Sequence, residues 1–128
     1  MEITSLETIR FDESSDLTDT ERDIRLTLLR VHTDEGVVGL GETYPFGRVD
    51  SAMLLGPIAD RVLGRDPRRI ESIRDDLVTD FNYYSHTGTE SRAMSALDIA
   101  LWDIKGQLCG QPIYELLGGA VRTEIPTY

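Results

Sequence analysis

The chain has 128 residues, of which 40% are apolar, and a formal net charge of −10. This length supports one domain with a modest core, but not a (β/α)8 barrel, which takes about 250 residues. The negative charge argues against nucleic acid as a partner, because phosphate binding needs a basic surface. No uncharged run approaches the ~20 residues of a membrane helix, and the first residues lack the features of a signal peptide. We therefore expect a soluble, cytoplasmic protein without a membrane partner.

Two features of the composition bear on chemistry and origin. A single cysteine, Cys109, permits no internal disulfide and no cysteine metal cluster, and we expect it to be a small packing residue. Twelve arginines accompany one lysine, and acidic residues are in excess. This bias is typical of proteins from salt-loving organisms and also of GC-rich genomes, and it carries no information about a reaction.

The first third of the chain predicts a small antiparallel sheet. Residues 3–11 read as a strand, and residues 12–21 as a polar, acidic loop. Residues 23–33 read as a second strand. Its apolar residues occupy alternate positions, and this alternation changes from even to odd positions where Leu28 and Leu29 are adjacent. The change predicts a β-bulge at that point. A hairpin turn with Gly36 at positive φ should then lead into a third strand at residues 37–42.

From Val49 onward the apolar period becomes helical. A first helix should extend to Val62, weakened or kinked at Gly56–Pro57 because proline removes a backbone donor. Asp66 is a plausible N-cap for a second helix, with Pro67 at its first position. The predicted buried faces of these helices are Ala52, Leu55, Ile58, Ala59 and Val62, and then Ile70, Ile73, Leu77 and Phe81.

A third, longer helix is predicted near the end of the chain. Thr87 and Glu90 have the spacing of a capping box, so the helix should begin near Gly88. Its buried face should contain Leu97, Leu101, Ile104 and Leu108, and a thin alanine stripe (Ala93, Ala96, Ala100) should let another helix approach closely. A short helix at residues 112–117 should end at Gly118 and Gly119. Strands followed by helices predict an α+β fold, a three-stranded antiparallel sheet followed by a helical bundle.

Three motifs in the last third carry a resemblance to a known family. They are SALDIALWDIKG at residues 95–106, G-x-P-x-Y-x-L-L-G-G at residues 110–119, and I-P-T-Y at residues 125–128. Together they resemble the mandelate racemase and muconate lactonizing enzyme branch of the enolase superfamily, and Gly39-Leu40-Gly41-Glu42 extends the resemblance backwards. The resemblance implies an N-terminal capping domain at residues 1–120. Residues 121–128 would then be the beginning of the first strand of a (β/α)8 barrel that this chain lacks.

The resemblance also implies an activity for the intact enzyme. Members abstract a proton α to a carboxylate, and Mg2+ stabilises the resulting enediolate. The motifs lean towards acid-sugar dehydratases and racemases, although epimerases and cycloisomerases stay open. The implied enzyme is a lyase or isomerase that takes Mg2+ as cofactor and a small carboxylate as substrate. We also expect a homo-oligomer, because loss of the family's C-terminal tail, which returns to this domain, should leave apolar surface exposed. The family's metal ligands and catalytic bases lie on barrel strands, so we expect no catalytic and no metal-binding residue in this chain, which should be inactive alone.

Two loops are the best candidates for a functional role. By resemblance, the capping domain closes over the barrel mouth with residues 12–22 and 43–49. The second loop contains Tyr44, Phe46 and Arg48, which would provide aromatic walls and one guanidinium for an anionic substrate. Alternatively, the aromatic side chains could simply attach the loop to the domain, with Arg48 facing solvent. Residues 82–89, with two tyrosines and a histidine, could serve a subunit contact or the rim of the pocket.

Two other interpretations concern the long helix and the chain as a whole. Asp98, Trp102 and Lys105 share one helical face, and we expect a structural role in which the two charges flank a half-buried indole. The alternative to a capping domain is a stand-alone binding or oligomerisation module without catalysis. The strand-like tail at residues 121–128 disfavours such a module, because it is useful only if a barrel follows.

Overall fold

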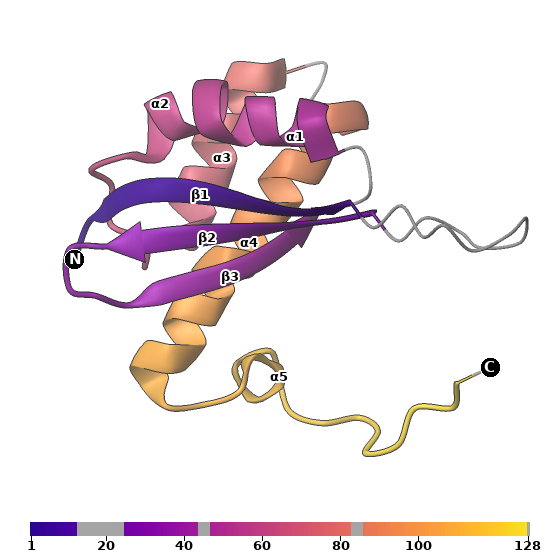
Figure 1. The fold of residues 1–128 in the computed structure, drawn as a ribbon. Coiled ribbons are helices and arrows are strands. Elements are labelled where there is room, and N and C mark those ends of the chain that lie inside the picture. The colour runs from indigo at the N-terminus through magenta and orange to yellow at the C-terminus, as the bar shows by residue number, and fades with distance from the viewer. Residues whose placement is uncertain (13–24, 44–46, 83–85, 128) are drawn as a thin grey trace, which may run out of the picture.

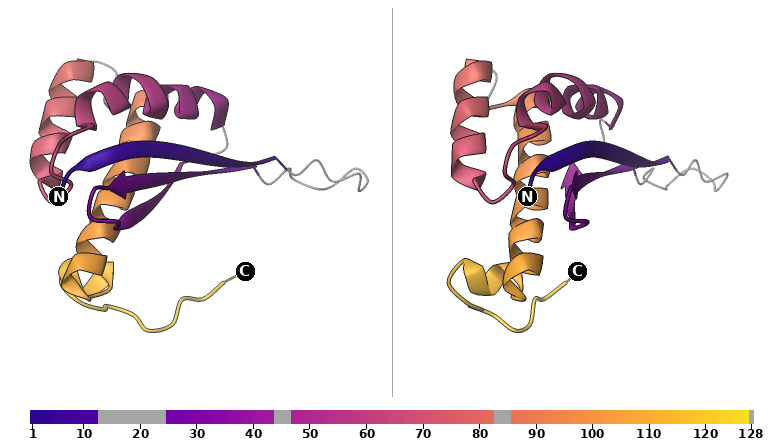
Figure 2. Two further views of the ribbon diagram at one scale, coloured as in Figure 1. Left: turned by 60° about the vertical axis from the view of Figure 1, so that its left-hand side comes forward. Right: turned by 90° about the vertical axis from the view of Figure 1, so that its left-hand side faces the viewer.

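The computed structural model describes residues 1–12, 25–43, 47–82 and 86–127. Strands come first and helices follow, so the α+β prediction is confirmed (Figure 1). Helix α4 (Gly88–Cys109) lies against the sheet, with α3 (Ile70–Phe81) on its far side (Figure 2). The elements are β1 (Ile3–Asp12), β2 (Arg25–Thr33), β3 (Val38–Thr43), α1 (Gly47–Met53), the π-helical turn η1 (Leu54–Ile58), α2 (Ala59–Val62), α3 (Ile70–Phe81), α4 (Gly88–Cys109) and α5 (Ile113–Leu116).

The sheet is antiparallel with β2 at its centre. The predicted bulge at Leu28 and Leu29 is wrong, because both residues pair with β1 in continuous register. The two leucines belong to opposite faces of a regular strand: Leu29 is fully buried, whereas Leu28 is half-buried on the other face. The buried side of β2 consists of Thr27, Leu29, Val31 and Thr33.

The irregularity of the sheet lies instead at the beginning of β1. The register shifts between Ile3, which pairs with Thr33, and Ser5, which pairs with His32. One extra residue in a strand reverses the direction of the side chains that follow. The shift therefore brings Leu6 onto the core alongside Ile3, although the two positions differ in parity.

The hairpin between β2 and β3 has the predicted turn. Gly36 has a φ of 81°, which glycine adopts without steric cost. The hydroxyl of Thr33 donates a hydrogen bond of 2.8 Å to the carbonyl oxygen of Val37 and closes the turn.

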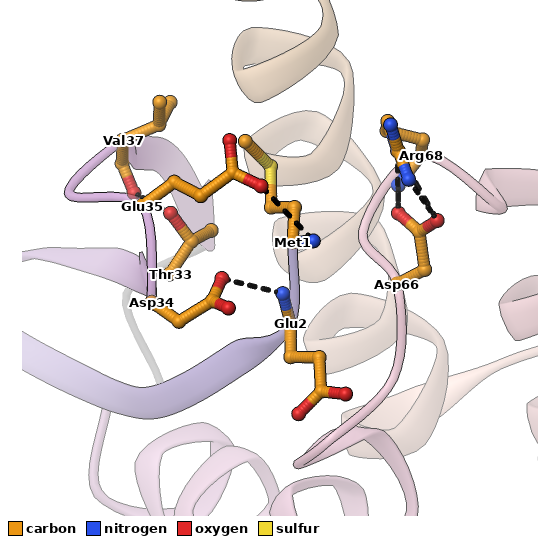
Figure 3. A network of polar contacts seen from close by, with 8 residues as sticks. All are labelled: Met1, Glu2, Thr33, Asp34, Glu35, Val37, Asp66 and Arg68. Carbon is orange, nitrogen blue, oxygen red and sulfur yellow. Dashed lines mark hydrogen bonds and ion pairs between the residues drawn. The ribbon is translucent and has the colours of Figure 1, made fainter.

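The first residues of the chain attach to this hairpin. The backbone N–H of Glu2 donates to Asp34 Oδ1 at 2.7 Å, and the Met1 amino group lies 3.0 Å from Glu35 Oε1 (Figure 3). The hydrogen bond to Glu35 raises the pKa of this amino group above its usual value. These contacts fix the end of the sheet that lies opposite the candidate loops.

The predicted weakness at Gly56–Pro57 is confirmed as a π-helical turn between α1 and α2. Pro57 has no N–H to donate, and the Ala59 N–H reaches back five residues to the carbonyl of Leu54. The wider turn changes which side chains face inward, so Ala52 and Leu55 are exposed, contrary to the prediction. The buried face is Leu54, Ile58, Ala59 and Val62.

Helix α3 has the predicted apolar face, with Ile70, Ile73 and Leu77 buried and Phe81 half-buried. The guanidinium of Arg61 lies over the Phe81 ring, 4.9 Å from its centroid. This face packs into the core that the helices share with the sheet.

Asp66 does not cap α3, which begins four residues later. Its carboxylate accepts the backbone N–H of Arg68 at 3.0 Å and pairs with the Arg68 guanidinium at 2.7 Å (Figure 3). The Arg69 N–H bonds to the Asp66 carbonyl and completes a separate turn before the helix. A short side chain can bond only to the amides just ahead of it, so Asp66 stabilises the turn in which Pro67 also lies.

Helix α4 begins at Gly88 with Thr87 as its N-cap residue, as predicted. Thr87 makes no side-chain capping bond, so the start of the helix is right but the expected capping box is absent. On the predicted apolar face Leu97, Leu101 and Ile104 are buried, whereas Leu108 is 43% exposed.

Two residues of the alanine stripe of α4, Ala96 and Ala100, pack closely against a strand, whereas the sequence suggested another helix. Ala96 and Ala100 lie under β3, where a Cβ atom on Gly41 or Gly39 would overlap their carbonyl oxygens. The glycines of β3 and the alanines of α4 therefore form one close contact between sheet and helix.

Side chains from the last turns of α4 satisfy the outer edge of β3. The Leu40 N–H donates to Asp103 Oδ2 at 2.8 Å, and the amide of Gln107 donates to the carbonyl of Val38 at 2.8 Å. Unpaired backbone groups at a sheet edge invite pairing with other strands. Asp103 and Gln107 occupy part of this edge and fix the angle between α4 and the sheet.

The chain after α4 follows the predicted stops. Gly110 has a φ of 61° at the end of α4, and Gly118 and Gly119 follow α5 at positive φ.

Cys109 is exposed, so it is not the packing residue that we expected. Residues 120–127 form neither helix nor strand. None of the described helices is long and apolar enough to cross a membrane.

Candidate functional site

Both candidate loops attach at the same end of the sheet. Asp12 at the end of β1 pairs with Arg25 at the start of β2, and Thr43 at the end of β3 pairs with Thr27. The hairpin and the first residues of the chain lie at the opposite end (Figure 1). The antiparallel topology thus brings together the attachment points of two segments that lie about twenty residues apart in the sequence.

A buried cluster around Asp50 connects β3, α1 and α4 at this end. Asp50 is fully buried in α1, and its Oδ2 accepts a hydrogen bond of 2.9 Å from the Thr43 hydroxyl. Arg92 of α4 donates to both carboxylate oxygens, at 3.0 and 3.1 Å, and also to the hydroxyl of Thr89. The hydrogen bond to Asp50 raises the pKa of Arg92. Thr43 and Asp50 flank residues 44–46, so the cluster fixes both ends of the second candidate loop.

The sequence analysis did not single out Asp50 or Arg92. A signal was nevertheless present, because Asp50 lies four and eight residues before Leu54 and Ile58 and so falls on the buried face. A charge on such a face needs a partner, since an unpaired buried carboxylate is costly. Arg92 directly precedes Ala93, the first residue of the alanine stripe, but only the tertiary structure brings Arg92 and Asp50 together.

The structure places one of the three predicted substrate-contact residues. Arg48 lies in the first turn of α1 and is exposed. Tyr44 and Phe46 lie outside the described residues. Contact of these three side chains with a substrate therefore stays a prediction.

The other predicted loop lies partly outside the described residues. Residues 83–85 include both of its tyrosines, whereas His86 is exposed. His86 lines a groove between α3 and α4.

The face of α4 that carries Asp98, Trp102 and Lys105 has the expected structure. The ammonium group of Lys105 lies over the half-buried Trp102 ring, 4.6 Å from its centroid. A cation–π contact of this kind stabilises a helix surface and requires no ligand. Asp98 is half-buried in the same groove as His86.

No three acidic, histidine or cysteine side chains converge in the described parts of the chain in a way that could hold a metal ion. Among the described residues, His32 and Glu7 do approach each other: His32 Nε2 lies 3.2 Å from Glu7 Oε2, and Arg30 Nη1 lies 3.5 Å from the same oxygen. These residues form an exposed ladder across β1 and β2, which is an ordinary cross-strand arrangement.

Comparisons with known proteins agree with this architecture. The model of the mandelate racemase / muconate lactonizing enzyme N-terminal domain matches residues 7–118. A D-galactonate dehydratase from Ralstonia nicotianae is 41% identical over 105 residues, which cover 81% of this chain and 27% of that protein. The chain therefore spans about a quarter of the length of this curated relative.

Two solved structures show how far the similarity extends in three dimensions. An enolase of the mandelate racemase subgroup from Agrobacterium tumefaciens is 45% identical, with a TM-score of 0.81, and the match covers 100% of this chain and 33% of that one. A mandelate racemase/muconate lactonizing protein from Paracoccus denitrificans, complexed with magnesium, is 31% identical, with a TM-score of 0.82, and the match covers 98% and 32%. The chain belongs to the mandelate racemase/muconate lactonizing enzyme family, whose N-terminal domain it represents.

Proposed function

We propose that this chain is the capping domain of a Mg2+-dependent enzyme that abstracts a proton α to a carboxylate, in the manner of an acid-sugar dehydratase. The observation that carries the proposal is the common end of the sheet at which both candidate loops attach, with the second loop held by the buried Asp50–Arg92 pair. The 41% identity to a D-galactonate dehydratase supports the substrate class.

In this proposal the chain's own residues bind and cover the substrate. Arg48 pairs with a carboxylate of the substrate, because an exposed guanidinium can form two parallel hydrogen bonds to it. Tyr44 and Phe46 provide apolar walls that exclude water from the reacting carbon. The Asp50–Arg92 pair holds the segment that carries them in position.

The Mg2+ ion belongs to the rest of the intact enzyme. The described residues do not fit a magnesium site, because they present no converging set of oxygen ligands. We therefore assign this chain no step of the proton transfer. When bound, Mg2+ would stabilise the negative charge that develops on the substrate carboxylate.

The proposed boundaries follow from the same assignment. Residues 1–120 form the capping domain, and residues 121–128 enter the first strand of the barrel. Apolar side chains near this junction are exposed and would pack against the barrel, notably Leu108, Tyr114, Leu117, Val121 and Ile125. We further propose that the intact enzyme is a cytoplasmic homo-oligomer.

Two measurements test the proposal. The intact mass of the protein isolated from its own source should be close to three times 14.4 kDa, since a barrel adds about 250 residues. That protein should dehydrate one or more acid sugars with Mg2+ and lose activity in EDTA. A mass of 14.4 kDa would favour the alternative, a stand-alone binding or oligomerisation module. A full-length protein that is inactive on every acid sugar would contradict the substrate class.

A further inference from the structure

A groove between α3 and α4 has no residue of the loops at 12–22 and 43–49 in its lining, although His86 of the predicted loop at residues 82–89 lies at it. It holds about 500 Å3 and is lined by both helices. On α4, Ala96 and Ala100 face β3, whereas Asp98 lies two positions further along, or about 200° round the helix from Ala96. The groove therefore occupies the face of α4 that points away from the sheet.

Asp98 is an unpaired carboxylate in this groove. It lines the groove next to Trp102 and is half-buried, yet it makes no hydrogen bond or ion pair with any residue that the structure describes. Burial raises the pKa of Asp98, Arg74 lowers it and Glu71 raises it. A desolvated carboxylate of this kind gains stability from a cationic partner.

The charges around the groove do not supply that partner. Three carboxylates line it, those of Glu71, Asp75 and Asp98, against one guanidinium. That guanidinium belongs to Arg74, which lies 3.7 Å from Glu71 on its own helix. The lining therefore has an excess of negative charge beside apolar side chains such as Met94 and Ile99.

The shape of the groove indicates the kind of occupant. Its lining on α4 runs from Ser91 to Trp102, which is about 16 Å at 1.5 Å per residue. An extended segment of about five residues has this length, at ~3.3 Å per residue. We propose that the α3–α4 groove docks a short extended segment of a partner polypeptide, which places an arginine against Asp98 and apolar side chains against Met94 and Trp102.

Arginine fits this position better than lysine does. A guanidinium forms two parallel hydrogen bonds to a carboxylate, and it loses less hydration than an ammonium group when it enters a partly buried site. Lys105 already lies over the Trp102 ring and illustrates that the indole accepts a neighbouring cation. The proposal does not depend on the proposed catalytic function, because it concerns a different face of the domain.

The test uses the fluorescence of Trp102, the single tryptophan of the chain. The probes are three peptides, acetyl-Ala-Leu-Arg-Leu-Ala-amide and its counterparts with glutamine or glutamate in place of arginine. The arginine peptide should change the emission saturably, and the change should weaken as salt is added. The glutamine peptide should bind about tenfold more weakly, and the glutamate peptide more weakly still.

Three variants separate the contact with Asp98 from general attraction to an acidic protein. Asp98→Asn should weaken the arginine peptide about tenfold, whereas Asp60→Asn, an exposed change on α2, should leave its affinity unchanged. Arg74→Gln should strengthen binding, because it removes a positive charge in the lining that repels the arginine of the peptide. Far-UV circular dichroism checks the fold of each variant. If Asp98→Asn does not fold, the relative affinities of the three peptides for the unaltered chain test whether the groove recognises the arginine. Equal binding of the three peptides, no saturable response, or an unchanged affinity in folded Asp98→Asn would each overturn the proposal.

Discussion

Replacement of Arg92 by methionine tests whether the buried ion pair holds the candidate loop. The substitution keeps most of the side-chain volume but leaves the carboxylate of Asp50, which is 0% exposed, with the Thr43 hydroxyl as its remaining partner among the contacts described above. Removal of one member of a buried pair costs about 3–5 kcal/mol. The Arg92 side chain is 29% exposed, so water can partly replace it. We therefore expect a loss at the lower end of that range, about 3 kcal/mol.

The assay is urea-induced unfolding at pH 7, followed by circular dichroism. A loss of about 3 kcal/mol is a large fraction of the 5–15 kcal/mol that stabilises a typical domain. It should lower Tm by roughly 10–15 °C for a chain of this size. The control is Arg74→Ala, which breaks a 3.7 Å pair between exposed side chains and should cost less than about 0.5 kcal/mol.

A second variant of the same pair tests the direction of the argument. Asp50→Ala leaves Arg92 behind, and because Arg92 reaches solvent this variant should be less destabilised than Arg92→Met. The double variant should lose less than the sum of the two single losses. If Arg92→Met costs no more than the Arg74→Ala control, the pair does not stabilise this end of the sheet and the reasoning is refuted.

Three further predictions concern other parts of the chain. Gly41→Ala should lower the free energy of unfolding by about 3 kcal/mol or more, because a Cβ atom there would overlap a backbone carbonyl of α4. The control, Gly56→Ala, has open space around it and should be neutral or stabilising by up to about 1 kcal/mol in the same urea assay. The hydrogen bonds to the neighbouring guanidinium lower the pKa of Asp66 from 3.8 to about 2, so its contribution is present above about pH 4 and is lost as the pH falls towards 2. Asp66→Asn should remove that part of the acid dependence, about 1 kcal/mol or less for so exposed a pair, and identical acid titrations of stability would contradict the assignment. In the intact enzyme, Arg48→Ala should reduce kcat/KM for an anionic substrate roughly 10–100-fold, while Arg69→Ala, also exposed, should not; equal effects would exclude a substrate contact.

Local pattern identified most of the elements of this fold. The hairpin at Gly36 and the helix that begins at Gly88 depend on residues close together in the chain, and both were predicted correctly. The motifs in the last third of the chain also identified the family, because each motif consists of residues that are contiguous in the sequence. The candidate loop residues at 44, 46 and 48 were chosen by position and residue type, and their contact with a substrate stays a prediction.

The errors arose where the inward direction of a side chain depends on a distant neighbour. The bulge lies at Ile3 and not at Leu28, and the π-helical turn replaces Leu55 by Leu54 on the buried face. In both cases one inserted residue changes the direction of all the side chains that follow in that strand or helix. The apolar periodicity of the sequence does not reveal such an insertion.

The sequence by itself determined the order of strands and helices, the stops between them and the family. These properties follow from short-range backbone preferences and from contiguous motifs. Only the tertiary structure decided that the small residues of α4 meet the glycines of β3, and that Arg92 neutralises Asp50 over a separation of 42 residues. Such contacts depend on the distance between elements after packing, and no local pattern in the chain specifies that distance.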